Sequence, residues 1–273
     1  MTRTGCTGDL GPATIVDVTT RPSSHDLPQT RWEGDPPPVV LLHAGVADRR
    51  QWDGVGPHLG RAAVAYDRRG YGQAPPQTEE HSHLGDLRAV LESLDAPAWL
   101  VGNSMGGALA LDAALELPDH VAGLVLLGSA VTGLTELPGY EEPPEAAVAE
   151  QALLAAEGTD LQAEAEVHHW LDGALAARGR VGGAVRELAL EMARGVTADE
   201  HDSGTRAWDR LAEVRVPVVV AVGELDEPAG VEISRRLAQR LPDARYVLLP
   251  GTAHLPSLDA PERVVALVRE ALA

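Results

Sequence analysis

The sequence predicts an α/β fold, namely a mostly parallel, doubly wound sheet with a helical cap insertion. Short, continuous apolar runs recur along the chain, which is typical of parallel strands covered on both faces. Segments with helical spacing of apolar residues alternate with these runs, as in repeated βαβ units. One long stretch without a strand pattern interrupts the alternation, and it predicts the inserted cap.

The predicted strands precede helical patterns in a regular order. The apolar runs lie at residues 39–42, 62–66, 98–101, 121–127, 216–222 and 245–249. Three prolines, Pro36, Pro37 and Pro38, precede the first run and predict a break in regular structure there. Period-two alternation predicts an additional antiparallel strand at 14–20. Helical spacing predicts helices at 82–94, 105–117, 229–241 and 261–272, the last with proline in its first turn. These elements predict one core domain over residues 13–131 and 212–273, preceded by a flexible segment at 1–12.

Residues 132–211 form the predicted cap. Their Ala/Glu/Leu-rich segments at 145–157 and 186–194 favour helices, and no convincing strand lies between them. The insertion falls between the sixth and seventh strands if the amino-terminal strands are counted. Because ligands bind at the carboxyl ends of strands in open α/β sheets, we expect the cap to roof the site.

Composition limits the partners of this chain. The formal charge is −19, and all 22 basic residues are arginine, so we expect repulsion from nucleic acid and from anionic membrane surfaces. The expected partner is a small-molecule substrate, and the expected assembly is a monomer or a homodimer. The one cysteine, Cys6, has no partner for an intramolecular disulfide. No long apolar run and no leader pattern occur, so the expected location is the cytoplasm.

A candidate nucleophile lies in the segment Gly102-Asn103-Ser104-Met105-Gly106, which matches G-x-S-x-G. This segment follows the predicted strand 98–101 and precedes the predicted helix 105–117, the setting that a nucleophile elbow requires. The flanking glycines allow a sharp turn that exposes the Ser104 hydroxyl at the amino terminus of a helix. The alternative interpretation is a tight turn of small residues without chemistry.

Two backbone N–H groups are candidates for an oxyanion hole. Met105 N–H lies at the positive end of the helix dipole, beside the predicted nucleophile. The second donor is expected in the loop after strand 39–42, where Gly45 is preferred and Val46 is the alternative. His43 in the same loop is expected to fix the loop by hydrogen bonds rather than to act as a base.

A serine nucleophile needs a base, and the base needs a carboxylate that orients it. The strand 216–222 is followed by three candidate acids, Glu224, Asp226 and Glu227. His254 is the one histidine that follows a late strand and precedes the terminal helix. The order serine, acid, histidine, with each residue at the end of a strand, is that of the nucleophile-elbow hydrolases.

Several residues are candidates for lining an apolar pocket between the core and the cap. They are mostly aromatic and comprise Val46, Trp52, Tyr140, His168, Trp170 and Trp208. The adjacent histidines His168 and His169 diverge on a helix and have no third ligand at suitable spacing. We therefore expect no metal site there.

These residues resemble the α/β-hydrolase superfamily, in particular its cap-bearing esterases, lactonases and carbon–carbon bond hydrolases. The resemblance covers roughly residues 38–271. It includes the loop at 41–45, the Asp67-Arg68-Arg69-Gly70-Tyr71-Gly72 turn, and the segments 102–107, 223–226 and 251–254. The resemblance implies a triad of Ser104, Asp226 and His254, an oxyanion hole of Gly45 and Met105, and no cofactor.

Departures from the family patterns narrow the expected reaction. The glycine-rich oxyanion loop of meta-cleavage-product hydrolases is replaced by residues 43–47, and Leu255 stands where their tryptophan follows the catalytic histidine. Serine at the elbow argues against haloalkane dehalogenases and epoxide hydrolases, which resemble this fold but use aspartate. The sequence therefore predicts acyl transfer from a largely apolar ester or lactone. The alternatives are a carbon–carbon bond hydrolase and a non-catalytic binding protein of the same fold.

Overall fold

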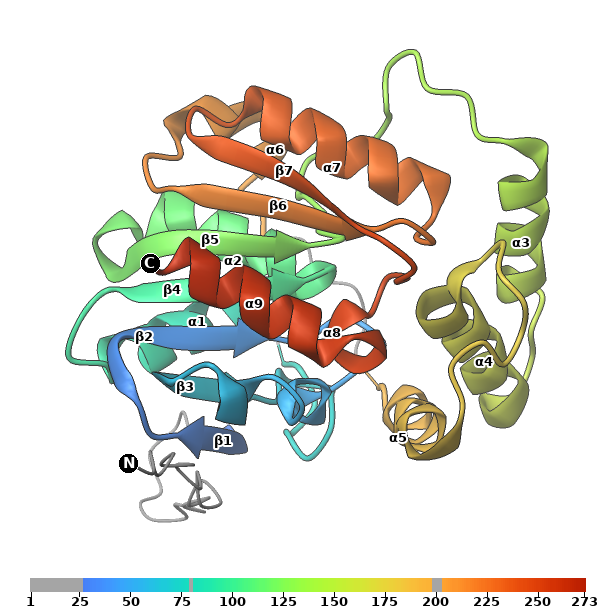
Figure 1. Ribbon diagram of the computed structural model, residues 1–273, viewed down its shortest axis with the longest axis horizontal. Helices are drawn as coiled ribbons and strands as arrows, with labels where there is room; N and C mark the ends of the chain where they lie inside the picture. The colour runs from blue at the N-terminus through green and yellow to red at the C-terminus, as the bar shows by residue number, and fades with distance from the viewer. Residues whose placement is uncertain (1–26, 79–80, 198–202) are drawn as a thin grey trace, which may run out of the picture.

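The computed structural model describes residues 27–78, 81–197 and 203–273 (Figure 1). The predicted strand at 14–20, the segment 1–12 and Cys6 lie outside these residues. The described chain forms a seven-stranded sheet in the order β1-β3-β2-β4-β5-β6-β7. Only β1 is antiparallel to its neighbour, so the predicted mostly parallel α/β sheet is confirmed. The strands are β1 (Gln29–Trp32), β2 (Asp35–Leu42), β3 (Arg61–Tyr66), β4 (Ala98–Asn103), β5 (Val121–Leu127), β6 (Val218–Gly223) and β7 (Ala244–Leu249).

The start of the sheet differs from the prediction in two ways. The prolines expected to precede the first core strand lie inside β2, whose register with β3 shifts between Asp35 and Val39. Proline is tolerated there because that exposed, irregular end of the strand does not need every ladder N–H. The edge strand β1 was missed because Gln29, Thr30 and Arg31 carry no apolar run.

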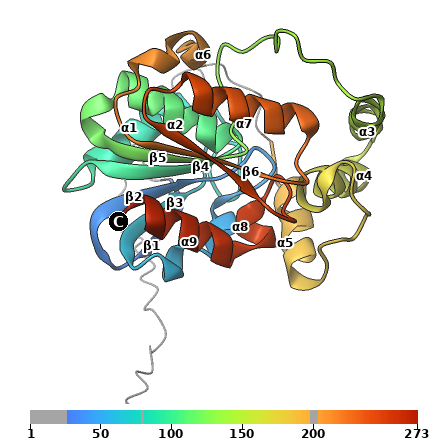
Figure 2. The same cartoon turned by 45° about the horizontal axis from the view of Figure 1, so that its top comes forward.

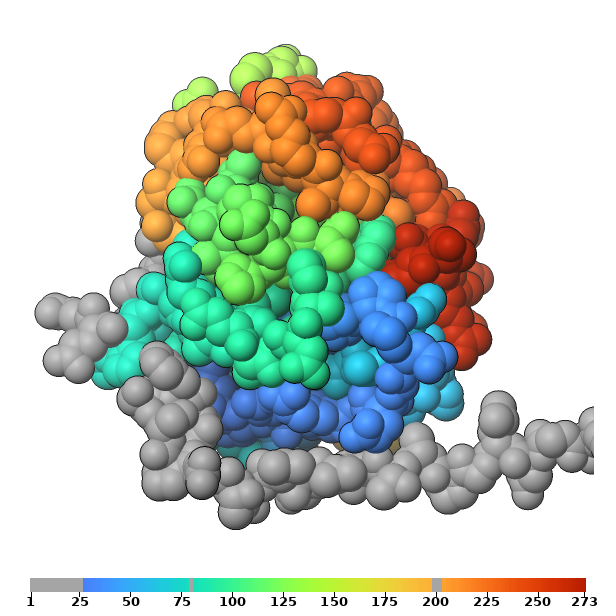
Figure 3. All heavy atoms as spheres, turned by 90° about the vertical axis from the view of Figure 1, so that its left-hand side faces the viewer, coloured from blue at the N-terminus to red at the C-terminus, as the bar shows by residue number. Residues whose placement is uncertain are grey.

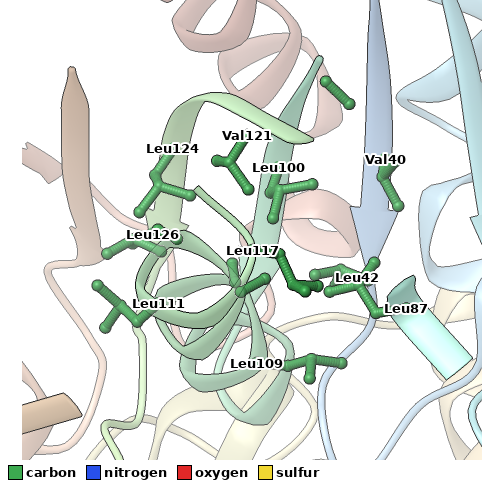
Figure 4. Close-up of a cluster of buried hydrophobic side chains, with 14 of the residues drawn as sticks. Val40, Leu42, Leu87, Leu100, Leu109, Leu111, Leu117, Val121, Leu124 and Leu126 are labelled. Carbon is green, nitrogen blue, oxygen red and sulfur yellow. The ribbon is translucent and has the colours of Figure 1, made fainter. Parts of the chain in front are cut away.

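Helices cover both faces of the sheet. One face packs against α1 (His83–Glu92), α2 (Met105–Glu116) and α7 (Pro228–Arg240). Figure 4 shows side chains of β2, β4 and β5 meeting those of α1 and α2 in this cluster. The other face packs against α9 (Pro261–Ala271) and the short helix η1 (Arg49–Trp52). The four helices predicted for the core are confirmed as α1, α2, α7 and α9.

The helical insertion lies beyond the carboxyl ends of the strands (Figures 1 and 2). It comprises α3 (Pro144–Leu154), α4 (Thr159–Glu166), the π-helix η4 (Val167–Gly173) and α5 (Gly183–Arg194). It follows β5, the fifth described strand, because the predicted strand at 14–20 lies outside the described residues. Helices α3 and α5 match the predicted ones, whereas α4 and η4 were not predicted.

The remaining short helices belong to the core. They are η2 (Gly56–His58), η3 (Pro118–His120), α6 (Ala207–Arg210), η5 (Leu211–Glu213) and α8 (Pro256–Asp259). Residues 207–211 fall within the predicted cap at 132–211, but Ala207 and Leu211 pack in the core cluster of the sheet. Figure 3 shows the end of the molecule opposite the insertion, where segments before it and segments after it form one continuous surface. Within the described ranges, no helix is long and apolar enough to cross a bilayer.

Candidate active site

Ser104 lies in the turn between β4 and α2. Its backbone has φ of 53° and ψ of −118°, which is a strained conformation for a residue with a Cβ. Two of its backbone hydrogen bonds tie this turn to β5 and the loop after it: Ser104 N–H donates to the Leu127 carbonyl at 2.9 Å, and Ala130 N–H donates to the Ser104 carbonyl at 3.1 Å. The geometry therefore places Ser104 at the N-cap of α2, beside the positive end of the helix dipole.

The turn lies directly against the end of β2. A Cβ at Gly106 would overlap the carbonyl oxygens of Leu42 and His43, so glycine is required for this close approach. The contact brings the loop after β2 next to Ser104. A Cβ at Gly45 would lie 2.5 Å from the sulfur of Met105, which shows that the two predicted oxyanion residues are neighbours.

Asp226 and His254 form a buried pair above the sheet. Asp226 follows β6 and His254 follows β7, and each is 8% exposed. His254 Nδ1 lies 2.9 Å from both carboxylate oxygens of Asp226. Burial lowers the pKa of His254, but the charge and hydrogen bond of Asp226, together with the charge of Glu227, outweigh it, so the pKa lies above its ordinary value. This bond assigns the proton to Nδ1 and leaves Nε2, which makes no hydrogen bond to a described residue, as the basic nitrogen.

The other two candidate acids have different partners. Glu224 accepts a hydrogen bond from Gly251 N–H at 2.9 Å. Glu227 contacts Nε2 of His169, a residue of the insertion. Of the three carboxylates, Asp226 is therefore the one that orients His254.

A buried network of amide side chains connects the loops of the site. Asn103 Nδ2 donates to the carbonyl of His254 at 3.0 Å, so the residue before Ser104 is tied to the histidine loop. Gln51 Nε2 donates to Asn103 Oδ1 at 2.7 Å and to Ser257 Oγ at 2.8 Å, and Gln51 Oε1 accepts from Ala44 N–H at 2.9 Å. Sequence reasoning missed Gln51 and Asn103, because neither residue type at these positions has a local signal.

The insertion contacts the pair through its π-helix η4. The ring of Trp170 lies 4.5 Å from the ring of His254, between centroids, at an angle of 44°. The preceding residue, His169, meets Glu227. Because π-helical turns occur frequently at functional sites, both the position and the geometry of η4 fit a role beside His254. Of the aromatic residues predicted to line a pocket, Trp170 is the one in contact with His254.

Two other predicted pocket residues lie elsewhere, and these predictions are wrong. Trp52 is fully buried in the core cluster on the α9 face of the sheet. It lies at the end of η1, which packs against that face, so its side chain belongs to the core and not to a pocket between core and cap. Trp208 packs beneath the guanidinium of Arg240, 4.2 Å from the ring centroid. Arg240 ends α7, whereas Asp226 precedes the start of that helix, about 18 Å away at 1.5 Å per residue.

The remaining candidates lie around the site rather than against His254. His168 faces Asp172 at 3.5 Å and lines a cavity of about 200 Å³ within the insertion. Tyr140 lines a cavity of about 450 Å³ that also includes Asp226. Val46 packs against Leu255 and helices of the insertion.

A cavity of about 330 Å³ begins beside Met105 and was not predicted. Its walls include Arg68, His83, Leu109 and Val131. Its volume falls within the range of small-molecule sites, about 300–1,000 Å³. Among the residues that the structure describes, no group of three or more suitable side chains could hold a metal ion.

A family model described as the alpha/beta hydrolase fold matches residues 37–261. A pimeloyl-[acyl-carrier protein] methyl ester esterase of Neisseria meningitidis serogroup A is 30% identical over 245 residues, 85% of this chain and 75% of that protein.

Two solved structures are similar over most of the chain. A thermophilic esterase from Thermogutta terrifontis, with malate bound, has a TM-score of 0.68 at 25% identity, covering 95% of this chain and 98% of the other. An N-acyl homoserine lactone degrading enzyme has a TM-score of 0.59 at 26% identity, covering 89% and 96%.

Proposed function

Because the chain belongs to the alpha/beta hydrolase fold family, we propose that it is a serine hydrolase that cleaves a carboxylic ester or lactone through an acyl-enzyme on Ser104. The observation that carries the proposal is the bond of Asp226 to His254 Nδ1 at 2.9 Å. That bond leaves Nε2 as a base, in a site where Asn103 ties the loop of His254 to the turn of Ser104.

In the first step, His254 Nε2 takes the proton of the Ser104 hydroxyl while Oγ forms a bond to the substrate carbonyl carbon. The negative charge on the carbonyl oxygen is stabilised by the N–H groups of Gly45 and Met105. The carbonyl then re-forms as the bond to the alkoxy oxygen breaks, and the imidazolium gives its proton to that oxygen, which departs as the alcohol of an ester or remains attached as the hydroxyl of an opened lactone. The positive charge on His254 is stabilised by Asp226 throughout.

In the second step, His254 takes a proton from water, and the oxygen of that water attacks the acyl carbon. The tetrahedral intermediate collapses, Ser104 regains its proton, and the carboxylic acid leaves. The cavity beside Met105 is the candidate site for the acyl chain, because Leu109 and Val131 give it apolar walls.

A substrate panel tests the proposal. The panel contains methyl and nitrophenyl esters of increasing acyl length and N-acyl homoserine lactones, because the Neisseria relative is named for a methyl ester and one similar structure for such lactones. We expect kcat/KM to be highest for a small-to-medium acyl group. A fluorophosphonate should label the wild-type protein on the peptide that contains Ser104.

Two results would contradict the proposal. Faster turnover of a dienone acid than of any ester or lactone would identify a carbon–carbon bond hydrolase. Failure of the folded protein to react with the fluorophosphonate, together with no turnover across the panel, would identify a binding protein.

Gly128 provides a test of how closely Asp226 and His254 must approach. A Cβ at Gly128 would lie 2.8 Å from Asp226 Oδ2 and 3.1 Å from His254 Nδ1. Gly128→Ala should therefore force the pair apart and lower kcat by ~10²-fold, the size of effect that a displacement of about 1 Å has in an active site. Ester turnover of the purified variant measures this.

Gly139→Ala is the matched control. Gly139 also has a positive φ, 70° against 48° for Gly128, but no described atom lies within 4 Å of its added Cβ. Both variants impose the same kind of backbone strain, and only Gly128→Ala touches the pair. Equal kcat values for the two variants would show that the contact with Asp226 and His254 is unimportant.

A further inference from the structure

Arg68 is a buried cation without a carboxylate partner. It follows β3 and is 1% exposed, and it forms no ion pair with any residue in the described part of the chain. The next residue, Arg69, is also buried but donates to Asp86 at 2.8 Å. An unpaired buried charge is costly, and burial lowers the pKa of Arg68. A guanidinium nevertheless remains charged, so its field acts on whatever surrounds it.

The groups around the Arg68 guanidinium belong mainly to the oxyanion loop. Its Nη2 donates to the carbonyl oxygens of His43 at 3.0 Å and Ala44 at 3.1 Å. The guanidinium also lies over the ring of Tyr71, 4.6 Å from the centroid. The charge is therefore directed at the backbone that immediately precedes Gly45.

The carbonyl of Ala44 and the N–H of Gly45 belong to one peptide group. In a trans peptide these two groups point in opposite directions, so a donor on the oxygen leaves the N–H facing away from it. Standard backbone dimensions then place Arg68 Nη2 within about 5 Å of the Gly45 nitrogen. The guanidinium therefore lies on one side of the Ala44–Gly45 peptide, and the expected position of the oxyanion lies on the opposite side, in front of the Gly45 N–H.

His43 supplies a second donor to the same carbonyl. Its Nε2 accepts from the backbone N–H of Arg68 at 3.1 Å, which assigns the ring proton to Nδ1. Nδ1 lies 2.7 Å from the Ala44 carbonyl oxygen. Complete burial lowers the pKa of His43 well below its ordinary value, so the ring is neutral and keeps this arrangement. On the other side of the residue, Ala44 N–H donates to Gln51.

We propose that Arg68 is a positioning residue that orients and polarises the Ala44–Gly45 peptide and thereby strengthens Gly45 N–H as a donor to the oxygen of the substrate under attack. This inference rests on the proposed function. Hydrogen bonds in series strengthen one another, and a charged donor on the carbonyl makes the N–H of the same peptide more acidic. The benefit appears where negative charge develops, that is, in the transition state.

Substitution of Arg68 tests the proposal on the ester that the wild type hydrolyses best. Arg68→Ala should lower kcat by ~10-fold or more, less than the ~10²–10³-fold effect of removing an oxyanion donor. For Arg68→Gln and Arg68→Lys, which keep most of the side-chain volume in the cavity wall, KM should stay within about twofold, because binding of the uncharged ester does not use the polarised donor. Arg68→Gln retains an N–H donor without the charge and should remain slow, whereas Arg68→Lys should recover part of kcat.

Chemical rescue separates the charge from the space that the side chain fills. Arg68 lines the cavity beside Met105, so a small solute can reach the space left in Arg68→Ala. Millimolar guanidinium chloride, far below denaturing concentrations, should restore kcat of this variant. Urea, which has nearly the same shape and no charge, should not restore it. Neither solute should raise the kcat of the wild type.

Each outcome bears on the proposal. A wild-type kcat for Arg68→Gln, or equal rescue by urea and guanidinium, would overturn it, because the effect would then come from loop support without charge. If Arg68→Ala does not fold, Arg68→Gln and Arg68→Lys still test the charge. No turnover by the wild type would overturn the proposed function and this inference with it. Wild-type turnover that is insensitive to all Arg68 variants would overturn this inference alone.

Discussion

Replacing Ser104 with alanine is expected to lower kcat for the best ester by ~10⁶-fold, as loss of the nucleophile does in serine proteases. The fold should persist, because the backbone N–H and carbonyl of residue 104 still hold the turn through Leu127 and Ala130. Initial rates on the best ester measure the loss, and circular dichroism with thermal unfolding measures the fold. The variant should also no longer react with a fluorophosphonate.

Ser129→Ala is the control for this experiment. Ser129 is buried close to the site and donates its hydroxyl proton to the carbonyl of Ala130 at 2.6 Å. It has no role in the proposed mechanism, so its variant should retain both turnover and labelling. If Ser104→Ala and Ser129→Ala turn over the ester at similar rates, the nucleophile is not Ser104.

Asp226→Asn is expected to lower kcat by about 10⁴-fold, because an amide neither holds the required tautomer of the histidine nor stabilises the imidazolium. The backbone of the loop should be retained, since the side chain accepts from Glu227 N–H at 2.8 Å through an oxygen that asparagine also has. Steady-state kinetics at saturating ester give the change in kcat.

The pH dependence of kcat/KM provides a second measurement of the effect of Asp226→Asn. His254 must be neutral to accept a proton, so activity is lost as pH falls through its pKa. In the wild type, the charge and hydrogen bond of Asp226 and the charge of Glu227 overcome the effect of burial and raise this pKa, so the acidic limb of kcat/KM should lie above the ordinary histidine value. Asp226→Asn removes the charge of Asp226, the largest raising contribution, and leaves the burial and the smaller effect of Glu227, so the limb should move to lower pH.

Glu224→Gln is the control for the pH profile. Glu224 lies two residues from Asp226, but its carboxylate accepts from Gly251 N–H and does not face His254. The limb should stay in place in this variant. An acidic limb that is unchanged in Asp226→Asn, or one that moves equally in Glu224→Gln, would contradict the assignment of Asp226 as the partner of His254.

The sequence by itself determined the core of the fold. Apolar runs predict the parallel strands because strands covered on both faces must be continuously apolar, and β2 to β7 lie where those runs do. Since the carboxyl ends of parallel strands meet at one edge of a sheet, the positions of Asp226 and His254 in the chain were enough to place both at that edge, where they form a hydrogen bond. Local pattern was sufficient wherever a role follows from the end of a strand.

Only the tertiary structure decided which of several similar residues meets the site. Trp52 and Trp170 were both predicted to line the pocket. Packing buries Trp52 in the core on the α9 face of the sheet, whereas Trp170 contacts the ring of His254. Arg68 and Arg69 are adjacent and identical in type. Arg69 pairs with Asp86, whereas Arg68 is left with the carbonyls of the oxyanion loop. The physical reason is that such partners come from segments far apart in the chain, and no local pattern records their approach.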